Sequence, residues 1–434
     1  HVRGFDARTG ERLWIFHTIP HPGEFGHDTW EDEGWKLTGN TGAWTPMSAD
    51  PELGYVYLPL EAPTHDFYGG HRPGDNLFSQ SLVCLDAATG ERVWHYQTVH
   101  HGIWDYDLPA PPVLLDIAVD GKEIPAVAQV TKQGFTFVFD RRNGEPVWPI
   151  EERAVPKSDV PGEHTSATQP HPTLPVPFDR QGVTENDLNN LTGEIFEEAK
   201  RIASEYRMGP LFSPPALYTE EIKGQLVSPT PFGGANWQGA VGDPDTGIIY
   251  VSSTTGISAL SLVHDPEQSE MDYIGGPGTR IQGPFGLPLA RPPWGRITAI
   301  DLKTGQHVWM MANADTPDEI LAHEKLQGID IPRTGHNERV GMLVTASLFF
   351  AGEGAGLYVA TGSGNLLRAH DKQTGEILAA IELPANQSGM PMTYAVNGKQ
   401  YIVVAVGAQG HAGELVALTL PDVDNSDSEK RGGD

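Results

Sequence analysis

The stretch VRGFDARTGERLW at residues 2–14 decides the fold, because close copies of it recur along the chain. Each copy reads as a strand, a tight Asp-x-x-Thr-Gly or Asp-x-x-Asn-Gly turn and a second strand, which in four of the five copies reaches a Trp. The Asp can cap the turn, and the Gly supplies a positive φ. The other copies lie at residues 82–94, 137–148, 297–309 and 367–375.

A second kind of hairpin alternates with the first and is built on Asp-Pro-x-x-Gly, at residues 50–54 and 243–247. Pairing the two kinds predicts sequential antiparallel sheets with Trp and Gly at fixed offsets, which is typical of an all-β fold, the β-propeller of four-stranded blades. We expect one partial propeller domain over residues 1–434. The expected four-stranded units lie at 43–97, 111–152, 236–312 and 341–382, with half a unit at 1–17 and a three-stranded unit at 390–419.

These units, about five blades' worth of strands, do not close a circle by themselves. An open propeller leaves unpaired strands at two faces, so we expect further blades upstream of His1. The chain opens in what reads as a strand, and no run approaches the roughly 18 apolar residues that a bilayer span requires.

Composition restricts the possible partners and cofactors. The chain has 29 basic and 57 acidic residues and a formal charge of −28, which repels phosphate backbones, so we expect no nucleic-acid partner. Cys84 is the single cysteine, which excludes an intrachain disulfide, a cysteine zinc site and covalent haem attachment through Cys-x-x-Cys-His. Any electron carrier must therefore be separate or non-covalently bound.

The connections between hairpins are long, with the largest insertions at about 153–235 and 254–294, and we expect them all at one end of the propeller. Binding and catalytic groups concentrate on such loops. We expect a helix at 185–207 within the first insertion, and substrate selectivity in both insertions and in the loop 18–43.

Three segments at that end carry side chains suited to chemistry. The loop TVHHGIWDYDLP at 98–109 holds Asp105 and Asp107, either of which can accept an alcohol proton, although capping a blade junction is the alternative role. Lys132 lies in the very short turn 131–134, so it must sit near the axis, where its ammonium can polarise a carbonyl or quinone oxygen. Trp44 and Trp237 stand where long loops enter innermost strands and can floor a pocket for a planar ligand, or pack in the core.

Together these motifs resemble the pyrroloquinoline quinone (PQQ)-dependent dehydrogenases. The resemblance rests on the repeats, on His-His-x-x-Trp-Asp-x-Asp at 100–107, Thr-Lys-x-Gly at 131–134 and Pro-Met-Thr-Tyr at 391–394, and it covers essentially the whole chain. It is closest to the membrane glucose dehydrogenase type, whose catalytic part is an eight-bladed periplasmic propeller. The resemblance implies oxidation of a sugar or alcohol hydroxyl with PQQ and a divalent metal, calcium or magnesium, and electron transfer to a quinone or a cytochrome.

Carried over by position, the resemblance makes Asp105 the general base, Lys132 the partner of the quinone oxygens and Trp44 the floor under the cofactor. Asn236, followed by Trp237, resembles a cofactor-contacting asparagine of the family. Asp107 is then expected to cap the entry into the next blade.

The metal site departs from the family pattern. The alcohol-oxidising branch has an Asn in the loop after the second strand of the 43–97 blade, where this chain has Ala62. The family's acidic ligand is expected upstream of His1, which leaves Glu61 as the candidate within the chain, although an exposed loop Glu is the alternative. One cysteine also excludes the vicinal cysteine pair of that branch.

Two other classes of protein share part of this pattern. A non-catalytic propeller scaffold has the same repeats but usually short loops at both ends. A glycan-binding propeller would stack aromatic side chains on sugars, but it would leave Asp105 and Lys132 without a role.

Overall fold

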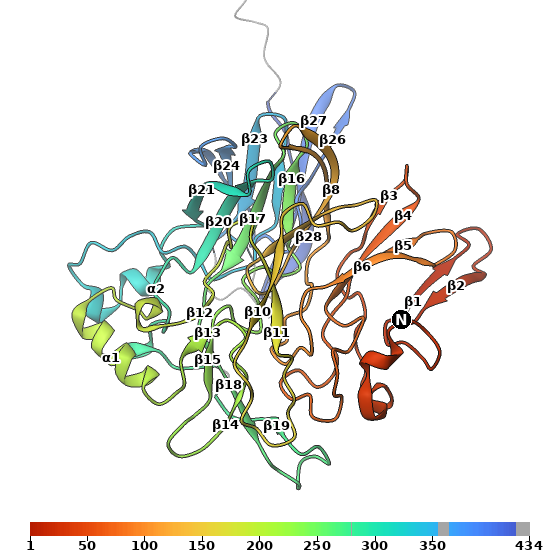
Figure 1. The fold of residues 1–434 in the computed structure, drawn as a ribbon. Helices are drawn as coiled ribbons and strands as arrows, with labels where there is room; N and C mark the ends of the chain where they lie inside the picture. The colour runs from red at the N-terminus through yellow and green to blue at the C-terminus, as the bar shows by residue number, and fades with distance from the viewer. Residues whose placement is uncertain (279, 355–363, 422–434) are drawn as a thin grey trace, which may run out of the picture.

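The computed structural model describes residues 1–278, 280–354 and 364–421, and these are organised mainly as antiparallel sheets. The sheets fan out at one end of the molecule, and the irregular connections gather at the other (Figure 1). No helix among the described residues is long and apolar enough to cross a membrane.

Three of the four expected four-stranded units form with their strands hydrogen-bonded in chain order, and the last unit has three strands as expected. A β-propeller of four-stranded antiparallel blades is therefore confirmed as the fold. The strands of these units, in chain order and preceded by the hairpin of β1 (Val2–Phe5) and β2 (Arg12–Phe16), are β3 (Ser48–Asp50), β4 (Tyr55–Pro59), β5 (Ser81–Asp86) and β6 (Arg92–Gln97); β16 (Ala240–Asp243), β17 (Ile248–Thr254), β20 (Gly295–Asp301) and β21 (Gln306–Ala312); β22 (Met342–Val344), β23 (Leu348–Gly352), β24 (Leu366–Asp371) and β25 (Ile377–Glu382); and β26 (Met392–Val396), β27 (Lys399–Ala408) and β28 (His411–Leu418).

The unit expected at 111–152 is a three-stranded sheet, so the prediction of a fourth strand there was wrong. Pro146 makes only an isolated bridge to Phe139, because proline has no N–H to donate to a continuing ladder. The chain beyond it turns away and forms a separate hairpin. The sheet consists of β7 (Val113–Val119), β8 (Lys122–Val130) and β9 (Thr136–Asp140), and the hairpin of β10 (Ile150–Ala154) and β11 (Thr168–Pro172).

Neighbouring blades are joined where the Trp of one repeat packs on the Gly of the next. A Cβ added to Gly144 would lie 2.7 Å from the indole of Trp94, so only glycine allows this approach. At Gly305 the nearest side chain is instead Leu174, from the irregular segment that follows Trp148. The same Trp-on-Gly contact recurs between Trp14 and Gly90 and between Trp309 and Gly375.

A backbone carbonyl completes each of these junctions. The carbonyl of Arg141 accepts hydrogen bonds from Trp94 Nε1 (3.1 Å) and from the Tyr57 hydroxyl (3.0 Å), and Arg141 Nε lies 2.6 Å from Asp50 Oδ2. The later junction repeats this arrangement with the Lys372 carbonyl, Trp309, Tyr250 and Asp243.

The aspartate turns and the expected site lie at opposite ends of the blades. Asp140 ends β9, whereas Lys132 lies in the turn just before that strand begins. Asp86 likewise precedes β6, and Asp105 follows it. Asp105 and Asp140 therefore do not share a face, as we expect from the alternation of hairpins.

The two long insertions form a layer of short strands and helices at the loop end (Figure 1). The helix expected at 185–207 is shorter, because the Thr192 side chain caps a new helix start by accepting a bond from the Ile195 N–H at 3.1 Å. These elements are β12 (Gly182–Val183), α1 (Gly193–Ala203), β13 (Gly209–Pro210), β14 (Ala216–Leu217), β15 (Gln225–Val227), β18 (Ser258–Val263) and β19 (Ile274–Gly275), followed later in the chain by α2 (Asp318–Leu321); short 3₁₀ turns lie at His27–Thr29, Glu31–Lys36, Glu185–Asp187, Pro284–Gly286 and Glu324–Leu326.

Candidate functional site

Asp105 and Lys132 meet at the loop end, although 27 positions separate them in the chain. Lys132 Nζ donates to the Asp105 backbone carbonyl at 2.7 Å and to its Oδ1 at 3.0 Å. The backbone of Asp105 adopts the left-handed conformation, with a φ of 56°, which turns its carbonyl and its carboxylate toward the same ammonium. The two residues, which sequence reasoning had placed at the same end of the propeller, are thus in direct contact.

Asp107 shares the same lysine, since its Oδ2 lies 2.8 Å from Lys132 Nζ. Both carboxylates reach one ammonium, although the left-handed backbone of Asp105 interrupts the extended alternation that the sequence suggests. Asp107 Oδ1 accepts a bond from the Ala62 N–H at 2.7 Å. Asp107 thus ties the β4–β5 connection to Lys132, and the expectation that it caps the next blade was wrong.

The electrostatics of this cluster favour a charged lysine and a basic aspartate. Burial lowers the pKa of Lys132, but the charges and hydrogen bonds of Asp107 and Asp105 outweigh it and leave the pKa above its usual value. Burial raises the pKa of Asp105, Lys132 opposes that rise, and the charges of Asp107 and Asp66 add to it. A raised pKa makes the ionised carboxylate a stronger base than that of an exposed aspartate, but it also lowers the fraction that is ionised at neutral pH.

The glycine turn that precedes Asn236 approaches the same lysine. The Gly234 N–H donates to the Lys132 carbonyl at 2.9 Å, and a Cβ on Gly233 would lie 2.6 Å from Lys132 Cγ. Asn236 is buried; its Nδ2 donates to the Phe232 carbonyl at 2.7 Å and its Oδ1 accepts from the next N–H. Two glycines are therefore required for this loop to approach Lys132.

Trp237 and Trp44 present groups that a ligand can use. The Trp237 indole N–H is buried and has no hydrogen-bond partner within the described part of the chain. A buried unpaired donor is rare and indicates a bound water or ligand atom. The Trp44 side chain is 44% exposed, so its ring is open for stacking.

Glu61 stands between Trp44 and the Lys132 cluster. Its Oε1 accepts a bond from the Gly42 N–H at 2.9 Å, two residues before Trp44. Burial raises the pKa of Glu61 to about 7, which Gly42 and Lys132 oppose and the charge of Asp107 reinforces. Glu61 is thus not the exposed loop residue of the alternative interpretation. Even so, the described residues contain no cluster of three or more His, Cys, Asp or Glu arranged to hold a metal ion.

Sequence reasoning missed Asp66, whose pKa is raised by burial and by the charge of Asp107. The residue follows Glu61 in the β4–β5 connection, which has no periodicity, so no pattern could have placed it. Asp66 adds a fourth carboxylate to the surroundings of Lys132.

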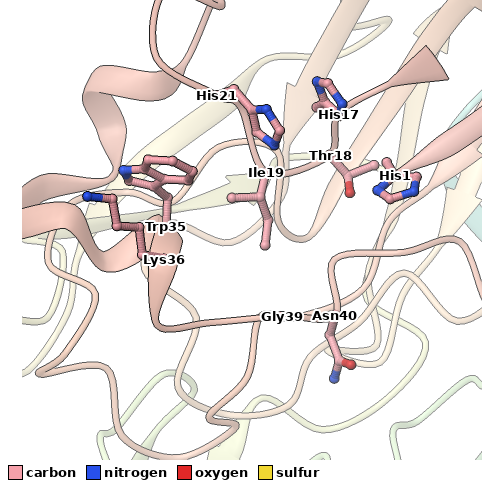
Figure 2. A pocket seen from close by; sticks show the side chains of 9 residues that line it. All are labelled: His1, His17, Thr18, Ile19, His21, Trp35, Lys36, Gly39 and Asn40. Carbon is pink, nitrogen blue, oxygen red and sulfur yellow. The ribbon is translucent and has the colours of Figure 1, made fainter.

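A cavity of about 500 Å³ lies beside this site on the loop 18–43. Its wall is shared with the Glu61 segment, because Asn40 bridges Pro63 and the Gly39 carbonyl accepts a bond from the Thr64 N–H at 3.2 Å. Figure 2 shows aromatic and polar side chains facing one another across the space. The lining residues are His1, His17, Thr18, Ile19, His21, Trp35, Lys36, Gly39 and Asn40.

Comparisons with known proteins show which family the chain belongs to. The family model for the glucose/ethanol/alcohol dehydrogenase β-propeller domain of PQQ proteins matches residues 1–402. The quinoprotein glucose dehydrogenase of Escherichia coli K12 is 33% identical over 97% of the chain, and a quinate/shikimate dehydrogenase (quinone) of Acinetobacter baylyi is 30% identical over 96%. The chain spans 54% and 53% of these two proteins.

Solved structures show the same fold. The quinohemoprotein alcohol dehydrogenase of Comamonas testosteroni superposes with a TM-score of 0.63 at 22% identity. The match covers 97% of this chain and 57% of the dehydrogenase chain. A europium-containing methanol dehydrogenase gives a TM-score of 0.60 at 23% identity, with 94% and 62% covered. With a family match over nearly its whole length and this fold, the chain belongs to the PQQ-dependent dehydrogenase β-propeller family.

Proposed function

We propose that this chain is the catalytic propeller part of a quinoprotein dehydrogenase that oxidises a sugar or alcohol hydroxyl, with Asp105 as general base. The observation that carries the proposal is the buried Lys132 ammonium held between Asp105 and Asp107. A non-catalytic scaffold has no need of such a cluster, because it costs desolvation energy for three charges.

All three ammonium protons of Lys132 have acceptors in this arrangement, namely the Asp105 carbonyl, Asp105 Oδ1 and Asp107 Oδ2. We propose that Lys132 exchanges its bond to Asp105 Oδ1 for a cofactor oxygen. Asp107 keeps the ammonium in place during that exchange. The Asp105 carboxylate is then free to accept the hydroxyl proton of the substrate.

PQQ is the cofactor that the family implies, and the chain offers groups that fit a planar, polar molecule. Lys132, Asn236, the unpaired indole N–H of Trp237 and the exposed ring of Trp44 would hold it. When bound, it supplies a quinone carbonyl carbon as hydride acceptor. A divalent metal is a further part of the proposal, with Glu61 as the candidate ligand, but no step here depends on it.

The proposal extends to partners and location. The A. baylyi relative is named for a quinone, which supports a separate quinone or cytochrome as electron acceptor. A periplasmic location accords with the glucose dehydrogenase type that the motifs resemble. The cavity on loop 18–43 is proposed to receive the part of the substrate away from the reacting hydroxyl, because it adjoins the Glu61 segment.

The test is kinetic and uses the full-length protein reconstituted with PQQ and calcium or magnesium. Asp105→Asn keeps the shape of the side chain but removes the base, so turnover should fall about 10²–10⁴-fold while the cofactor still binds. Asp107→Asn is the matched control and should lose less. Near-normal turnover in Asp105→Asn with an inactive Asp107→Asn would reverse the assignment.

A further inference from the structure

The loop that carries Asp105 is hydrogen-bonded to the insertion 153–235 as well as to the blades that it connects. Gln169 bonds both backbone groups of His100, at 2.8 Å to the N–H and 2.6 Å to the carbonyl. The Trp104 indole donates to the Ser213 carbonyl at 2.8 Å, and the Tyr106 hydroxyl to the Pro229 carbonyl at 2.6 Å.

One further contact between this loop and the insertion is charged. His101 Nε2 lies 2.7 Å from Glu163 Oε1, and both side chains are 1% exposed. His101 Nδ1 lies 2.8 Å from the Gly74 carbonyl. Both ring nitrogens therefore have an oxygen partner, which fixes the orientation of the imidazole ring.

Glu163 is held firmly enough to act as an anchor. Its Oε2 accepts a bond from the Gly69 N–H at 2.6 Å, and its Oε1 also accepts from the His164 N–H at 2.9 Å. Burial raises the pKa of Glu163, but the bond to His101, the His101 charge and the Gly69 N–H keep that pKa below its usual value. The carboxylate is therefore charged at neutral pH.

The loop needs such an anchor because its backbone is strained at the contact and again four residues after it. His101 has a φ of 45° and Asp105 a φ of 56°, a region that costs a non-glycine residue about 1–3 kcal/mol. Such conformations persist only where the surroundings determine them. The buried Arg72 guanidinium adds a bond of 2.7 Å to the Gly102 carbonyl.

We infer that Glu163 is a positioning residue, which orients the Asp105 carboxylate by holding the His101 ring four residues before it. The insertion thereby serves as the scaffold of the proton-accepting loop, in addition to any role in selecting substrates. This inference rests on the proposed role of Asp105 as the base.

The experiment compares Glu163→Gln with Glu152→Gln in the full-length protein reconstituted with PQQ. Glu152 makes the matched pair, because its Oε1 lies 3.1 Å from Nε2 of His100 on the same loop but its side chain is 47% exposed. Glu163→Gln should lower kcat about 10–100-fold, since a displacement of about 1 Å costs a rate of that order, and leave KM and PQQ affinity unchanged. Glu152→Gln should leave kcat unchanged.

A double-mutant cycle with Asp105→Asn separates positioning from a general structural role. If Glu163 acts through Asp105, Glu163→Gln should cause no further loss in the Asp105→Asn background. Losses that multiply, or a PQQ affinity that falls with kcat, overturn the inference. Near-normal turnover in Asp105→Asn alone would overturn the proposed function instead.

Should Glu163→Gln fail to fold, Glu163→Asp takes its place in the same cycle. It keeps the charge but draws the carboxylate back from His101 by one methylene. A folded Glu163→Asp protein with full kcat also overturns the inference.

Discussion

The packing of tryptophan on glycine between blades can be measured with two glycines of equal backbone geometry. Gly144 and Gly121 both have a φ of 76°, so alanine at either position suffers the same left-handed backbone cost, about 1–2 kcal/mol. A Cβ at Gly121 meets nothing within 4 Å, whereas one at Gly144 would lie 2.7 Å from the Trp94 ring. The indole cannot move away easily, because its N–H is bonded to the Arg141 carbonyl at 3.1 Å.

Gly144→Ala should therefore destabilise the protein by about 1–3 kcal/mol more than Gly121→Ala, which is the usual cost of overpacking a core. The assay is equilibrium urea unfolding followed by tryptophan fluorescence, with the two variants compared at the same protein concentration. In a Trp94→Leu background, the extra cost of Gly144→Ala should shrink. Equal losses in the two single variants would refute the reasoning, because the ring would then not be the constraint.

Three further outcomes are expected. Asp50→Asn removes the buried partner of the Arg141 guanidinium, which keeps its exposed partner Asp116 at 2.6 Å, and should lower the free energy of unfolding by about 1–3 kcal/mol, as measured by urea denaturation. Burial raises the pKa of Asp105, which must be ionised to act, so kcat/KM should fall on acidification at a higher pH than for an ordinary aspartate. Lys132→Met removes the opposing charge and should move this acidic fall of kcat/KM to still higher pH. Trp35→Ala in the cavity wall should raise KM for the best sugar or alcohol without changing kcat, and an unchanged KM across a substrate panel would remove the cavity from the substrate path.

The blades could be predicted from the sequence because local rules determine them. The turn of Asp86 to Gly90 or Asp301 to Gly305 sets both strands of its hairpin, and strand pairing in the structure follows. The prediction of a fourth strand after Gly144 was wrong, because Pro146 has no backbone N–H to donate. The repeat pattern does not take this missing donor into account. The helix expected at 185–207 was too long for a similar reason, a cap at Thr192.

The site could be predicted only in part. Motif and loop length were enough to assign Asp105 and Lys132 to the loop end, but their contact with each other was not predicted. The sharing of Lys132 by Asp107, the approach of Asp66 and the His101–Glu163 pair depend on segments without periodicity, and up to 62 positions separate the partners. Such contacts are set by tertiary packing, which leaves no local signal.

The carbonyl that accepts the tryptophan N–H at these blade junctions belongs to Ala87, Arg141 or Lys372, an alanine in one junction and a cation in the other two. Every residue has a main-chain carbonyl, so this hydrogen bond does not depend on the identity of the side chain at that position. The residue at that position can therefore vary. It forms an ion pair in one junction and is an alanine in another, and the hydrogen bond between the blades is kept in both. Any blade copied by duplication brings its own donor and its own acceptor, so an array of this kind can lengthen one module at a time.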